Sequence, residues 1–224
     1  MAILYSLISV LIVSLISLVG VLTLVFSTRF LSRIVFVLVS LSVGVLFGDV
    51  FIHIIPEVFT VLDPQVASFL ILAGILMFFV FEKFLHWRHS HGESDECHHH
   101  PEVQHQTLRS MVIFGDGIHN LIDGMLITAS YMISIPVGVA TTLAVIFHEI
   151  PQEVGNFGVL VHSGLSRGKA LFYNFLSALS AFVGVGIAFL LSGSVDNFAN
   201  IMLAFTAGGF IYIAGSDLVP ELHK

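Results

Sequence analysis

The sequence predicts an all-α protein, a polytopic membrane helix bundle that forms one domain over residues 1–224. Hydrophobic residues make up 56% of the chain, and Asp, Glu, Lys and Arg together make up 10%, against about 25% in soluble domains. The mean hydropathy of +0.99 is too high for a core enclosed by a wet surface. Long apolar stretches alternate with short polar links. Such a chain faces lipid, and its single cysteine, Cys97, excludes an internal disulfide framework.

Seven segments reach the roughly 20 apolar residues that a spanning helix needs. The first has no charge and is too long for the core of a signal peptide, so we expect it to be retained. The third is followed by the longest link, 87–107, whose low hydrophobicity predicts disorder. The seven segments are 3–26, 34–56, 66–86, 108–130, 136–162, 169–192 and 198–217.

The fourth and fifth segments carry polar clusters. Four polar residues of the fourth segment are spaced i, i+3, i+4 and i+7, and four of the fifth fall in a narrow arc, so each set shares one helical face. From Arg109 to residue 121 a helix rises about 18 Å, which is half of a bilayer core of about 30 Å. The short link predicts antiparallel neighbours whose polar faces meet at one depth. The two sets are Asp116, His119, Asn120 and Asp123, and His148, Glu149, Gln152 and Glu153.

Carboxylates at this depth need a partner. One ionised side chain costs at least about 2.5–3.5 kcal/mol on insertion scales, and no Lys or Arg lies near them in the sequence. Imidazole, carboxylate and amide ligands predict Zn²⁺, with Fe²⁺ or Mn²⁺ as alternatives. The competing interpretation is a set of interhelical hydrogen bonds. Pro151 removes the helical bond to the Phe147 carbonyl, and we expect that carbonyl to help line an ion path.

The sixth segment has no acidic residue, and the seventh ends in an acidic motif at the end of the sequence. Three segments precede the polar pair and two follow it, which predicts a missing eighth helix. "HIIPE" (53–57) ends the second segment and "DLVPE" (217–221) ends the seventh. These segments run in opposite directions, so the two motifs fit an inverted repeat.

The basic residues predict the orientation. All of them flank the same side of the predicted bundle, whereas the opposite links carry only acids, such as Glu57, Asp63 and Asp196. The positive-inside rule then places the N-terminus outside, or in a lumen, and link 87–107 in the cytosol. The eight basic residues are Arg29, Arg33, Lys83, Arg88, Arg109, Arg167, Lys169 and Lys224.

At these motifs the sequence resembles the ZIP (Zrt-, Irt-like) family of divalent-metal transporters. It is most similar to the subfamily with HNFTDG on the fourth helix and HExPHEVGDF on the fifth, which here are "HNLIDG" and "HEIPQEVGNF". The similarity continues through "GVLFGDVFIHIIPE", "GLSRGKALFYNFLSAL" and "GGFIYIAGSDLVPE".

The resemblance implies eight helices, a metal site between helices 4 and 5, a cytosolic histidine-rich link and metal flow towards the cytosol, with no enzyme activity. Gln152 stands where the subfamily has His, Asn156 stands where it has Asp, and the sixth segment lacks the glutamate of many members, which argues against a two-metal site. By position, the implied ligands are His119, Asn120, Asp123, His148, Glu149, Gln152 and Glu153.

Two further groups are candidates for a metal path. Asp49, His53 and Glu57 follow the second segment outwards as an entrance, and Asp217 and Glu221 follow the seventh inwards as an exit; Asp116 is a further path or gate candidate. The competing interpretation of these groups is helix caps and solvated ends. The link forms a candidate metal acceptor, or else a solvated linker. Its candidate ligands are His89, His91, Cys97, His98, His99 and His100.

The predicted function is therefore transport of a divalent metal ion, zinc first, towards the cytosol. A metal-selective channel or sensor is the first alternative. An intramembrane zinc-dependent hydrolase is the second, but "HEIPQE" lacks the second His of H-E-x-x-H and contains a proline. The expected partners are the metal ion, the lipid bilayer and, as one candidate assembly, a second copy of the chain. The sequence has no stripe of basic residues, so nucleic acid is not expected as a partner.

Overall fold

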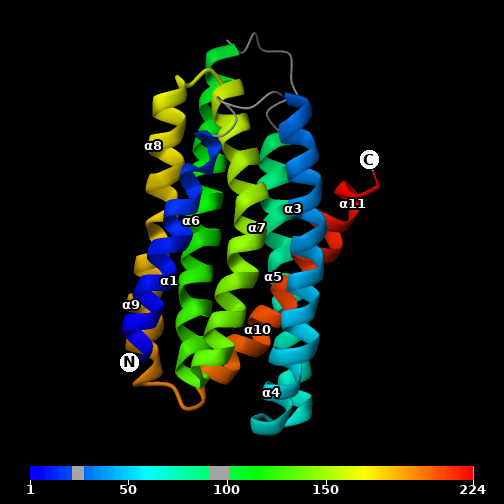
Figure 1. The fold of residues 1–224 in the computed structure, drawn as a ribbon, viewed down its shortest axis with the longest axis vertical. Coiled ribbons are helices and arrows are strands. Elements are labelled where there is room, and N and C mark those ends of the chain that lie inside the picture. The colour runs from blue at the N-terminus through cyan, green and yellow to red at the C-terminus, as the bar shows by residue number, and fades with distance from the viewer. Residues whose placement is uncertain (22–27, 91–100, 224) are drawn as a thin grey trace.

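The computed structural model is all-α and describes the backbone of residues 1–21, 28–90 and 101–223. Within these ranges it describes all side chains except those at 28–32, 82, 84–90, 101–107, 217 and 221. The helices pack as a bundle along one long axis, except that α10 crosses it obliquely (Figure 1). In chain order they are α1 (Ala2–Ile16), the 3₁₀ turn η1 (Ser17–Val21), α3 (Thr28–Gly48), the π-helical η2 (Asp49–Ile54), α4 (Ile55–Val61), α5 (Pro64–Ser90), α6 (Pro101–Ile133), α7 (Ile135–His162), α8 (Arg167–Ala178), α9 (Ser180–Ser192), α10 (Phe198–Tyr212), the π-helical η3 (Ile213–Leu218) and α11 (Val219–Glu221).

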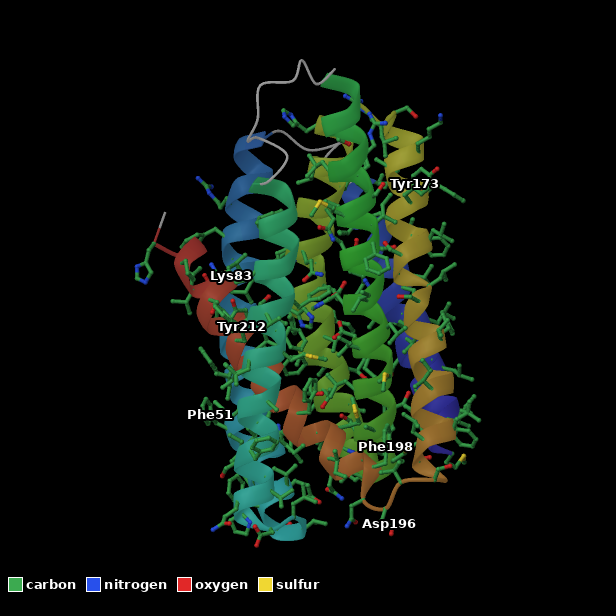
Figure 2. All side chains as sticks on the ribbon, turned by 180° about the vertical axis from the view of Figure 1, so that it is seen from behind. Phe51, Lys83, Tyr173, Asp196, Phe198 and Tyr212 are labelled. Atoms are coloured by element: carbon green, nitrogen blue, oxygen red, sulfur yellow. The ribbon has the colours of Figure 1, made fainter. Side chains whose placement is uncertain are left out.

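The predicted membrane bundle is confirmed in its coarse form. Five described segments are long and apolar enough to span a bilayer: Ala2–Val21, Arg33–Val61, Pro64–Phe81, Arg167–Ser192 and Phe198–Ser216. α6 and α7 are outside this set because their His, Asn, Asp and Glu residues lower the hydropathy. The outer faces of the bundle carry exposed large apolar side chains, such as Phe51 and Phe69, as a lipid-facing surface does (Figure 2).

The ends of link 87–107 differ from the prediction of disorder. α5 continues to Ser90 and α6 begins at Pro101, so both flanks of the link are helical. Proline is favoured in the first turn of a helix, where its missing N–H is not needed, and α5 ends shortly before Gly92. Residues 91–100 lie outside the described residues.

α6 and α7 lie at the centre of the bundle (Figure 1). They pack against each other and against α1, while α3 also packs on α7 and α9 and α10 on α6. Glycines set the spacing of α6 and α9: a Cβ on Gly124 would collide with the carbonyl oxygen of Ala181, and one on Gly184 with that of Leu121. This close contact holds α6 against α9. α6 carries half of the polar residues described next.

α7 continues as one helix through Pro151, and the carbonyl that this proline frees has a partner. The Ser42 hydroxyl of α3 donates to the Phe147 oxygen. The sequence predicted that this carbonyl would line an ion path. In the structure this carbonyl links α7 to α3 through the Ser42 hydrogen bond, and its role in an ion path stays a prediction.

Candidate metal centre

Four polar side chains from the two central helices converge in the interior. His119 and Asp123 lie one turn apart on α6, and His148 and Glu149 are adjacent on α7. One ligand atom from each of the four lies within 4.8 Å of the other three. Three of the four residues are buried, and His119 is nearly so. The polar faces of α6 and α7 therefore meet, as predicted, at these four residues.

The spacing of the four atoms fits a tetrahedral ion. His119 Nε2 lies 3.1 Å from Glu149 Oε1, 3.3 Å from His148 Nε2 and 3.6 Å from Asp123 Oδ2. His148 Nε2 lies 3.4 Å from Asp123 Oδ2 and 3.5 Å from Glu149 Oε1. A tetrahedral zinc site with bonds of about 2.1 Å has ligand-to-ligand edges of about 3.4 Å. These five distances, 3.1–3.6 Å, are close to that edge, and the carboxylate oxygens of Asp123 and Glu149 lie within 4.8 Å of each other.

The His148 ring is oriented by its own helix. Its Nδ1 lies 3.0 Å from the Ala144 carbonyl oxygen, which can only accept, so Nδ1 carries the proton in this contact. A neutral ring then presents the lone pair of Nε2 to the other three donors. A backbone carbonyl on the far nitrogen is the usual arrangement for a metal-binding histidine.

Among the described side chains, no Lys or Arg is paired with the carboxylates of this cluster, whose neighbours are the two histidines. Asp123 Oδ2 and Glu149 Oε1 are buried, and neither accepts a hydrogen bond of standard geometry among the described residues. Arg109, the only Arg or Lys in the α6 and α7 sequences, donates to the Ser163 carbonyl oxygen at the end of α7. The donor set therefore fits a bound cation better than a set of paired side chains.

The other three predicted ligands lie outside this group. Asn120 donates through Nδ2 to the Asp116 carbonyl oxygen at 3.1 Å, and the Gln152 side chain is within hydrogen-bonding reach of Asp116. Glu153 accepts a hydrogen bond from Asn174 Nδ2 on α8. Each of the three therefore has a polar partner outside the four-residue cluster, and the Glu153 side chain also lies within hydrogen-bonding reach of Glu149.

Asp116 is the centre of a second polar network that joins α6, α7 and α8. Its Oδ1 accepts from Asn156 Nδ2 at 2.8 Å, and its Oδ2 accepts from the Ser177 hydroxyl. Asn174 and Ser177 were not among the predicted site residues. Their i, i+3 spacing in the second half of α8 could have indicated them.

The path candidates are described in part. Asp49 is buried, with Oδ1 at 3.3 Å from Nδ1 of the exposed His53, and Glu57 is half-buried in α4. The remaining candidates have side chains outside the described ones, and these are Asp217, Glu221, His89, His91, Cys97, His98, His99 and His100.

Comparison with known proteins gives one consistent family. The profile of the ZIP zinc transporter family matches residues 1–107 and 87–224. The zinc transporter YKE4 of Saccharomyces cerevisiae is 33% identical over 83% of this chain, which spans 60% of that protein. The human metal cation symporter ZIP8 is 28% identical over 98% of the chain, which spans 62% of it. The human zinc transporter ZIP10 is 37% identical over 61% of the chain, which spans 17% of it. The chain thus covers less than two thirds of the length of each relative.

Proposed function

Because the chain belongs to the ZIP zinc transporter family, we propose that it carries a divalent metal ion, Zn²⁺ first, across a membrane through the cluster of His119, Asp123, His148 and Glu149. The observation that carries the proposal is the convergence of these four buried or nearly buried donors, whose ligand atoms lie within 4.8 Å of one another. The family is one of transporters rather than enzymes, which argues against the intramembrane hydrolase. Fe²⁺ and Mn²⁺ remain alternative substrates, since imidazole and carboxylate also bind them.

The path proposed on either side of the cluster uses the remaining candidates. Asp49, His53 and Glu57 form the entrance from outside. Asn120, Gln152, Glu153 and Asp116 form a second polar position next to the cluster, and Asp217 and Glu221 form the exit. The six link residues His89, His91, Cys97, His98, His99 and His100 receive the ion in the cytosol.

The finer topology belongs to the same proposal. We propose that the chain has seven spans, that its N-terminus lies outside or in a lumen, and that it belongs to the subfamily with the HNFTDG motif. An inverted repeat is supported by the two π-helical turns, since η2 ends two residues before Pro56 and η3 ends two residues before Pro220. A homodimer is the proposed assembly.

Uptake of Zn²⁺ into liposomes tests the function. Wild-type protein is compared with His148→Ala combined with Glu149→Ala, and with His162→Ala, an exposed histidine at the end of the same helix. We expect saturable uptake in wild type and in the His162 variant, and none in the double variant. Equal uptake in all three would contradict the proposal. Uptake that rises linearly with Zn²⁺ concentration would favour the channel alternative over a carrier.

A further inference from the structure

Each of the two imidazole rings of the cluster is flanked by a phenylalanine from the α5–α10 side of the bundle. The Phe78 ring of α5 lies 6.5 Å from the His119 ring at an interplanar angle of 85°. The Phe210 ring of α10 lies 5.6 Å from the His148 ring at 68°. Both contacts are edge-to-face, which is a favoured geometry for aromatic pairs. The two histidine rings are themselves perpendicular, at 5.4 Å and 85°.

The two phenylalanines have little freedom to move away. Phe210 is 1% exposed and belongs to the main apolar core, on which the half-buried Phe78 also packs. A Cβ on Gly209 would lie 2.6 Å from Cε2 of Phe78, so this ring rests on the α10 backbone next to Phe210. The two helices are in close contact, because a Cβ on Gly74 or Gly208 would collide with the backbone of the other helix. Figure 2 shows Lys83 and Tyr212 of the same helix pair, which both contact Phe79.

We propose that Phe78 and Phe210 are positioning residues for the metal ligands. They hold the planes of the His119 and His148 rings and exclude water from the cluster on the α5–α10 side. This inference rests on the proposed function. Groups that orient metal-binding histidines typically contribute 10–100-fold to metal affinity.

The two positions are not equivalent. His148 is also held at Nδ1 by the Ala144 carbonyl, 3.0 Å away. The His119 side chain keeps 12% of its exposure, so it is the ligand with more room to rotate. Loss of the Phe78 ring should therefore weaken metal binding more than loss of the Phe210 ring.

The test is Co²⁺ binding to the purified full chain in detergent, followed by the visible d–d absorption of the bound ion and by Zn²⁺ competition. We expect Phe78→Leu to lower the affinity by about tenfold and to alter the band shape, and Phe210→Leu to have a smaller effect. Gly209→Ala should displace the Phe78 ring and weaken binding, and adding Phe78→Leu to it should cause no further loss. Phe172→Leu, at an exposed position on α8, should match wild type.

Two controls make the result decisive. Phe78→Met keeps a large apolar side chain without a ring, so it replaces Phe78→Leu if that variant does not fold. Wild-type affinity and band shape in folded ring-less variants would overturn the inference. Asp123→Asn separates the two proposals: if it loses Co²⁺ while the phenylalanine variants do not, only the positioning role fails. If it binds as wild type does, the metal site itself fails.

Discussion

The hydroxyl of Ser42 on α3 donates to the carbonyl oxygen of Phe147 on α7, the carbonyl that Pro151 deprives of its helical donor. The same hydroxyl lies 2.7 Å from the Leu38 carbonyl oxygen of its own helix. One hydroxyl hydrogen serves two acceptors. When it turns to Leu38, the α3–α7 contact can open without leaving the hydroxyl unpaired.

The first prediction concerns this contact. Ser42→Ala leaves the part-buried Phe147 carbonyl without this donor, which should cost about 1 kcal/mol. Thermal unfolding of the purified protein measures the loss. Ser40→Ala is the control, because Ser40 is exposed and its hydroxyl donates to the Phe36 carbonyl oxygen of its own helix. Equal transition temperatures for the two variants would contradict the proposed role of Ser42.

The second prediction concerns the charge of Asp123. Asp123→Asn keeps the shape but removes a buried charge, and such charges cost several kcal/mol inside a membrane. It should therefore raise the unfolding temperature of the metal-free protein and abolish the increase that Zn²⁺ produces, which is worth about 2.7 kcal/mol at a hundredfold excess over Kd.

Unfolding with Zn²⁺ and with a chelator measures both effects of Asp123→Asn. Asp63→Asn is the control, since an exposed Asp63 caps α5 through Oδ1 and asparagine caps equally well. A stabilising effect of Zn²⁺ on Asp123→Asn as large as on wild type would exclude Asp123 as a ligand.

The third prediction concerns pH. Histidine and carboxylate must lose their protons to bind a metal, so protons compete with Zn²⁺. The Zn²⁺ concentration for half-maximal uptake should rise as the outside pH falls, because protonated imidazole cannot bind the ion. Uptake over a pH series measures it, with His162→Ala expected to follow wild type. A flat profile would contradict direct binding by the two histidines.

The fourth prediction concerns the close approach of α6 and α9. Gly184→Ala drives a methyl group into the Leu121 carbonyl of α6, and overpacking of this kind costs about 1–3 kcal/mol. Gly186→Ala, on the same helix with nothing within 4 Å of its Cβ position, should be neutral or stabilising by up to about 1 kcal/mol. Chemical unfolding in detergent compares them. Equal stability would show that the spacing of the two helices tolerates a Cβ.

The helices and the polar faces were predictable, because apolar length and 3.6-residue periodicity are properties of the chain itself. His119 with Asp123, and His148 with Glu149, were expected together and are together. The sequence predicted both Glu149 and Glu153 as ligands, and it could not show that Asn174 of another helix donates a hydrogen bond to Glu153. The sequence also did not predict that both flanks of link 87–107 are helical. There the continued helices satisfy the backbone hydrogen bonds. The aromatic contacts of His119 and His148 depend on how α5 and α10 cross, which no local pattern encodes.

The hydrogen bond between His148 Nδ1 and the Ala144 carbonyl oxygen has a consequence for ion selectivity. A ring that is already oriented before an ion binds sets the distances between the donors in advance. Four donors with edges near 3.4 Å suit a small ion of low coordination number. Calcium needs six to eight oxygens at about 2.3–2.6 Å, and magnesium keeps an octahedral shell of water. If the cluster binds the transported ion as proposed, the fixed His148 ring should disfavour Ca²⁺ and Mg²⁺ relative to Zn²⁺.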